Sequence, residues 1–116
     1  MNHSPRLLLV DDEPEILELL RLTFRDFDTE SALNTESALE ALRARHFDVL
    51  ITDIKMPGTP GLGLIDSAKK ISADIVVIVI TGHYQEMPSE ANGKVDHWIL
   101  KPFSIQSIRR AVLSSL

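Results

Sequence analysis

Four short runs of mostly apolar residues, each ending at a polar residue, constrain the fold of this chain most strongly. The runs cover residues 7–10, 47–52, 75–80 and 97–100, and the residues that follow them are Asp11, Asp53, Thr81 and Lys101. Because these runs lack a regular alternation of polar and apolar residues, they are typical of strands covered on both faces, as in a parallel sheet. A weaker run from Thr29 to Leu33 supplies a candidate for one more strand.

Between these runs, apolar residues recur at the spacing of a helix. Pro14 suits a first helical turn, Asn34 or Thr35 can cap the next helix, residues 64–71 form another helical pattern, and Ser104 starts the last one. Strands that alternate with helices predict right-handed crossover units. We therefore expect residues 1–116 to form one α/β domain, with helices on both faces of a doubly wound, five-stranded parallel sheet.

The stretch from His83 to Val95 is the weak part of this pattern. A helix fits there only between Pro88, which favours a helix start, and Asn92, which favours a stop. Such a short segment is not a stable helix by itself in water. We therefore expect the fourth helix of the fold to be short or irregular.

Composition narrows the classes of function. With a net charge of −5 and no basic tract, the 116-residue chain favours no direct nucleic-acid partner. The absence of cysteine excludes disulfides, thiolate catalysis and thiolate metal sites. The apolar run before Asp11 is too short for a signal peptide or a membrane span, so we expect a cytoplasmic protein without a membrane partner.

The residues that end the strands also carry the candidate chemistry. In open parallel sheets ligands bind beyond the carboxyl ends of the strands, and the residues at that edge would be Asp11, Asp12, Glu13, Asp53, Thr81 and Lys101. Neighbouring carboxylates repel one another and favour binding of a proton or a cation, and oxygen ligands without His or Cys suit Mg²⁺. Beside a carboxylate, a lysine and a threonine, such a metal indicates phosphoryl transfer to an aspartate.

Four segments at this edge form a joint motif. They are Asp11-Asp12-Glu13, Asp53-Ile54-Lys55-Met56-Pro57-Gly58, Thr81-Gly82 and Lys101-Pro102-Phe103. In order and approximate spacing they resemble the signature segments of response-regulator receiver domains, and the resemblance covers essentially the whole chain. It implies the flavodoxin-like strand order 2-1-3-4-5.

The same resemblance implies roles for the acidic residues. Asp53 would be the phosphoacceptor, and Mg²⁺ would be the cofactor. The metal would be bound directly by Asp12, mainly through water by Asp11, and also by Asp53 and the backbone carbonyl of Lys55.

The remaining motif residues would act on the phosphoryl group or on the switch. Thr81 would hydrogen-bond the phosphoryl group and Lys101 would pair with it. Trp98 occupies the place of an aromatic that moves inward together with the threonine. The bond between Lys101 and Pro102 would be cis, an arrangement that is accessible before proline.

Simpler interpretations compete for individual residues. Asp11 and Asp12 can serve as caps of the following helix, a role compatible with metal binding. Trp98 can be an ordinary packing residue of the last strand. The sequence also departs from the family pattern at Pro60, which precedes Gly61 where an aspartate is common, and in the short stretch 83–95.

Three classes of function remain to be compared. The leading one is a signalling switch, phosphorylated by a histidine kinase or a histidine phosphotransfer protein, that acts on an unknown output partner or effector domain and catalyses only its own phosphorylation and dephosphorylation. A phosphatase of the haloacid dehalogenase type would need an aspartate at position 55, which is Lys55. A degenerate receiver that binds partners without phosphorylation is the alternative, although all key motif residues are present.

Overall fold

The computed structural model describes residues 5–54, 61–82 and 93–116, which alternate between strands and helices. The strands are β1 (Arg6–Val10), β2 (Asp28–Ala32), β3 (Val49–Asp53), β4 (Val76–Thr81) and β5 (His97–Leu100). The helices are α1 (Pro14–Thr23), α2 (Thr35–Ala44), α3 (Gly61–Ile71) and α4 (Ile105–Ser115). The label α4 thus denotes the C-terminal helix, and the short helix predicted between Pro88 and Asn92 lies outside the described residues.

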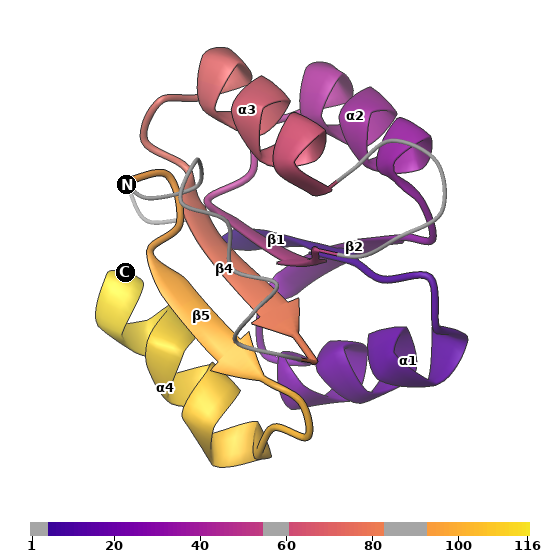
Figure 1. The fold of residues 1–116 in the computed structure, drawn as a ribbon, viewed down its shortest axis with the longest axis vertical. Coiled ribbons are helices and arrows are strands. Elements are labelled where there is room, and N and C mark those ends of the chain that lie inside the picture. The colour runs from indigo at the N-terminus through magenta and orange to yellow at the C-terminus, as the bar shows by residue number, and fades with distance from the viewer. Residues whose placement is uncertain (1–4, 55–60, 83–92) are drawn as a thin grey trace.

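All neighbouring strands are parallel, and their order in the sheet is β2-β1-β3-β4-β5. Helices α2 and α3 cover one face of the sheet, and α1 and α4 cover the other (Figure 1). The predicted doubly wound, flavodoxin-like sheet is confirmed. The weakest predicted strand, β2, is an edge strand, and this explains its more polar sequence.

Alternate residues of the central strands enter two separate hydrophobic cores. Leu8, Leu50 and Val79 belong to the core under α2 and α3. Leu9 and Ile80 belong to the core under α1 and α4. All five side chains have at most 1% of their surface exposed. Because both faces of each central strand are buried, the sequence of these strands is continuously apolar.

Two of the helices begin at polar side chains that satisfy a backbone donor of the first turn. Asn34 accepts a hydrogen bond from the Ser37 N–H at 2.8 Å, at the start of α2. Ser104 accepts one from the Ser107 N–H at 3.0 Å, at the start of α4. Helix α1 has no side-chain cap and begins with Pro14, at a position where the missing N–H needs no partner within the helix.

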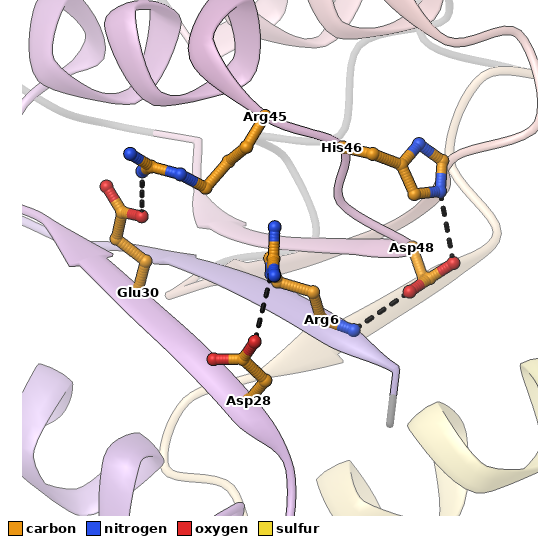
Figure 2. Close-up of polar contacts among 6 residues, drawn as sticks. All are labelled: Arg6, Asp28, Glu30, Arg45, His46 and Asp48. Carbon is orange, nitrogen blue, oxygen red and sulfur yellow. Dashed lines mark hydrogen bonds and ion pairs between the residues drawn. The ribbon is translucent and has the colours of Figure 1, made fainter. Parts of the chain in front are cut away.

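Two aspartates just before the start of a strand form hydrogen bonds with the backbone of the neighbouring strand. The Asp48 N–H donates to the Arg6 carbonyl at 2.8 Å. Asp48 Oδ2 in turn accepts from the Arg6 N–H at 2.8 Å (Figure 2). Asp96 and Val77 repeat the arrangement, with both distances again 2.8 Å. Each aspartate thus completes two backbone hydrogen bonds next to β3 or β5, and so helps to set the register.

Exposed ion pairs surround the first of these aspartates, at the amino ends of β1 and β3. Arg6 Nε lies 3.0 Å from Asp28 Oδ2 on the edge strand, and Arg45 pairs with Glu30 (Figure 2). His46 Nε2 lies 3.2 Å from Asp48 Oδ1. Because such exposed pairs typically contribute less than about 1 kcal/mol each, the backbone contacts of Asp48 are the more important element here.

We expect Asp48→Ala to lower the free energy of unfolding by about 1–3 kcal/mol, because the Arg6 N–H loses its acceptor at a half-buried position. Asp48→Asn keeps an acceptor oxygen and should lose less. Asp74→Ala, at an exposed turn residue, is the control. Chemical denaturation of the three variants measures the effect, and equal losses for Asp48→Ala and Asp74→Ala would contradict the role assigned to Asp48.

Candidate functional site

Strand register brings the polar residues at the carboxyl ends of the strands together. Val10 is paired with Thr52 across β1 and β3, so that Asp11 and Asp53 both follow this pair of neighbours. Thr81 is paired with Leu100 across β4 and β5. Ligand oxygens of four acidic residues all lie within 4.8 Å of one another, and these residues are Asp11, Asp12, Glu13 and Asp53.

Lys101 supplies a positive charge inside this acidic cluster. Its Nζ donates a hydrogen bond to Asp53 Oδ2 at 2.7 Å. It lies 3.2 Å from Glu13 Oε1 and 3.6 Å from Asp11 Oδ2. The Lys101 N–H also donates to the Thr81 carbonyl at 2.8 Å, which fixes the backbone of the lysine against β4.

Asp11 is fully buried, and its two carboxylate oxygens differ in their contacts. Oδ1 accepts a hydrogen bond from the Glu13 N–H at 2.9 Å, in front of α1. Oδ2 is a buried oxygen that accepts no hydrogen bond from the described residues, although Lys101 lies near it. The capping interpretation therefore accounts for one oxygen only, and the other is available to a cation.

Burial raises the pKa of the Asp11 carboxyl from 3.8 to about 6, and repulsion from Asp53 and Glu13 adds to the increase. The hydrogen bond from the Glu13 backbone and the Lys101 ammonium act in the opposite direction but do not outweigh burial. For Lys101, burial disfavours the ammonium. The hydrogen bond to Asp53 and attraction by the neighbouring carboxylates are together stronger, so the pKa of Lys101 rises above its ordinary value.

The donor set of the cluster fits a hard divalent cation. It offers carboxylate oxygens without histidine or cysteine, which suits Mg²⁺ better than a transition metal. Two of the acids, Asp11 and Asp53, are buried, and the other two, Asp12 and Glu13, are exposed. A cation held by these oxygens, with Asp11 Oδ2 among them, would relieve the repulsion between buried carboxylates.

The other residues predicted for the site differ in their burial and in their distance from the acidic cluster along the sheet, or lie outside the described residues. Thr81 is fully buried at the end of β4. Trp98 is half-buried on β5 and packs against the core under α2 and α3. The peptide bond between Lys101 and Pro102 is cis. The predicted ligand carbonyl of Lys55 lies outside the described residues.

Sequence reasoning included Glu13 in the acidic edge but missed its contact with Lys101. The side chain of Glu13 is 55% exposed, and its Oε1 lies 3.2 Å from Lys101 Nζ. Its position directly after two aspartates indicates proximity to the site. The direction of a long, exposed side chain is not encoded in that spacing.

Among the described residues, no helix is long and apolar enough to span a membrane.

Comparison with known proteins agrees with this geometry. Residues 7–113 match the family model described as the response regulator receiver domain. The probable transcriptional regulator ycf27 of Cyanidium caldarium is 32% identical over 95% of this chain and 45% of its own length. The transcriptional activator protein PfeR of Pseudomonas aeruginosa is 34% identical over 90% of this chain and 35% of its own length.

A solved structure shows the same fold at similar identity. The response regulator protein TrrA of Thermotoga maritima, determined in complex with Mg²⁺ and BeF, is 30% identical, with a TM-score of 0.88 over 97% of this chain and 99% of its own. Magnesium thus occurs with this fold in a similar protein.

The chain spans less than half the length of the two curated relatives. Because both are named as regulators of transcription, the prediction that excluded nucleic acid gains no support from them. The match along residues 7–113, together with the fold, shows that the chain belongs to the response regulator receiver domain family, the phosphorylation-dependent switches of two-component systems.

Proposed function

We propose that this chain is a switch in which Asp53 accepts a phosphoryl group from a phosphohistidine, in a reaction that depends on Mg²⁺. One observation carries the proposal: the largely buried Asp53 carboxylate lies 2.7 Å from the Lys101 ammonium, within a cluster of acidic oxygens. A nucleophilic carboxylate and a fixed cation for the phosphoryl oxygens thus stand side by side. The finer proposal is that the domain, which comprises residues 1–116, catalyses only its own phosphorylation and dephosphorylation.

The proposed reaction is a displacement at phosphorus. An Asp53 oxygen forms the new P–O bond while the P–N bond to the donor imidazole breaks, and the leaving nitrogen keeps the electron pair and takes up a proton. Lys101 stabilises charge on the transferring oxygens, and the Thr81 hydroxyl donates a hydrogen bond to the product.

Mg²⁺ would be held by the carboxylates of Asp11, Asp12 and Asp53 and by the Lys55 carbonyl. When bound, the ion supplies positive charge to the acceptor carboxylate and to the phosphoryl oxygens. The buried Asp11 oxygen without a hydrogen-bond donor supports this assignment, as does the all-oxygen donor set. Asp12 fits the role through its membership of the cluster.

The switch itself is proposed to begin at Thr81 and to reach Trp98. The backbone hydrogen bond between Lys101 and Thr81 links the two residues that would contact the phosphoryl group. Trp98 is partly exposed beside the core under α2 and α3, so an inward movement of its indole would bury more apolar surface. The donor would be a histidine kinase or a histidine phosphotransfer protein, and the output would be a partner or effector domain.

Incubation with Mg²⁺ and a small phosphodonor, followed by intact mass measurement, tests the function. We expect one added phosphoryl group on the wild-type protein and none on Asp53→Asn. Addition must also stop when a chelator removes the metal. A protein that stays unmodified under all conditions would support the degenerate receiver, and continuous phosphate release without a modified protein would support a phosphatase.

Lys101→Ala should bind Mg²⁺ more tightly than the wild type, because a competing cation leaves Asp53 and Asp11. The same change should slow phosphorylation, since the phosphoryl oxygens lose their ammonium partner. Lys70→Ala, on an exposed residue of α3, is the matched control. Metal titration followed by Trp98 fluorescence measures the affinity, and weaker Mg²⁺ binding in Lys101→Ala would contradict the proposed competition.

The raised pKa of Asp11 predicts how pH affects the metal-free protein. The folded state binds a proton with a pKa of about 6, against an ordinary value of 3.8. This contribution to stability is complete below the ordinary value and is lost as the pH rises through about 6. Asp11→Asn should therefore match the wild type near about pH 4 and exceed it by roughly 1–3 kcal/mol near about pH 7.5.

Denaturation in the presence of chelator at both pH values measures this difference. An advantage of Asp11→Asn that is the same at both values would show that Asp11 does not titrate in this range.

A further inference from the structure

Glu13 differs from the other acids around Lys101 in its exposure. Its carboxylate oxygen Oε1 lies 3.2 Å from Lys101 Nζ, and its side chain is 55% exposed. The side chains of Asp53 and Asp11, which also approach the ammonium, are 10% and 1% exposed. The ammonium thus contacts two buried carboxylates and one exposed carboxylate.

Buried and exposed acids around the ammonium differ in how they meet the proposed function. Asp11 and Asp53 are the buried members of the candidate metal site, and a bound cation would share their charge and weaken their attraction for Lys101. Glu13 belongs to the same acidic cluster, and its exposed carboxylate also accepts a hydrogen bond from Lys101 at 3.2 Å. Glu13 therefore competes with the phosphoryl oxygens for the ammonium.

We propose that Glu13 is a positioning residue that draws Lys101 away from the phosphoryl group and so limits both phosphorylation and the stability of the phosphorylated state. The inference rests on the proposed function of Asp53 and Lys101. It concerns the strength of the switch, which Glu13 would set through the lysine without contact with the reacting atoms. The exposed location of Glu13 makes its charge removable without opening the core.

The expected consequence is a gain of function on removal of the charge. Glu13→Gln keeps the size of the side chain and weakens its attraction for the ammonium. We expect beryllofluoride, a phosphoryl mimic, to bind about two- to fivefold more tightly in the presence of Mg²⁺, the range expected for an exposed ion pair. Phosphorylation by a small phosphodonor should accelerate by a similar factor.

A matched control and a double-mutant cycle separate this effect from a general change in charge. Glu15→Gln removes the same charge from the first turn of α1, at an exposed residue. It should leave beryllofluoride binding unchanged within error. In the Lys101→Ala background, Glu13→Gln should also have no effect, because the residue through which Glu13 acts is absent.

The cycle uses Trp98 fluorescence, the signal of the single tryptophan in the chain, to measure beryllofluoride affinity in wild type, both single variants and the double variant. Equal effects of Glu13→Gln with and without Lys101 would overturn the proposal. The charge of Glu13 would then act on the bound beryllofluoride directly and not through the lysine. An equal effect of Glu15→Gln would overturn it in the same way. An unchanged affinity in Glu13→Gln would show that the ion pair does not compete.

A second measurement needs neither metal nor phosphodonor. The NMR signal of the Lys101 side-chain Cε should shift in metal-free Glu13→Gln and stay in place in Glu15→Gln. An unshifted signal in both variants would overturn the proposal. If the wild type binds no beryllofluoride and accepts no phosphoryl group, the proposed function fails; if it does both while Glu13→Gln behaves like wild type, only the role of Glu13 fails.

Discussion

The attraction between Lys101 and the carboxylates around it is the interaction on which the rest of the site depends. Buried carboxylates so close together repel one another, and the low exposure of Asp11 and Asp53 increases that repulsion because water does not screen it well. One ammonium offsets part of it from 2.7 Å. The negative charge that remains makes the site suitable for a divalent cation, and burial, with a smaller contribution from this repulsion, raises the pKa of Asp11.

The amino and carboxyl ends of the strands have different roles. At the amino ends, Asp48 and Asp96 satisfy backbone donors of the neighbouring strands, so that the polar groups there are paired with the fold itself. At the carboxyl ends, Asp11 keeps a buried oxygen without a hydrogen-bond donor among the described residues. A buried acceptor without a donor lowers the stability of the fold, and proteins keep such a group where a ligand binds it. The unsatisfied oxygen at the carboxyl ends of the strands is therefore consistent with a functional site.

The sequence predicted the sheet better than it predicted the contacts between side chains. Continuous apolar runs identified the central strands because burial on both faces leaves few polar positions, and the polar residues after them located the site. Asp48 interrupts one run, yet the structure shows it as the residue that fixes the entry of β3. Its role depends on the backbone of Arg6, distant in sequence, which no local pattern reveals.

The direction of the Glu13 side chain likewise could not be predicted from nearby residues. Its carboxylate pairs with Lys101, which is distant in the sequence and follows the last strand. The roles of individual motif residues rest on the family resemblance and on their proximity in the acidic cluster. Proximity alone does not distinguish a residue that would bind the metal from one that only lies next to it. Lys55 and the expected short helix lie outside the described residues, so the structure neither supports nor contradicts those predictions.

The strand that directly precedes Lys101, β5, is the part of the sheet best suited to respond to a change at the site. β5 is an edge strand that pairs only with β4, and all four of its residues are half-buried. β3, by contrast, pairs on both sides and is buried throughout. In the proposed switch, movement of Lys101 towards a phosphoryl group would therefore disturb less packing than movement of Asp53. The backbone hydrogen bond from Lys101 to Thr81 would then carry the change to the end of β4, while the proposed acceptor stays in place.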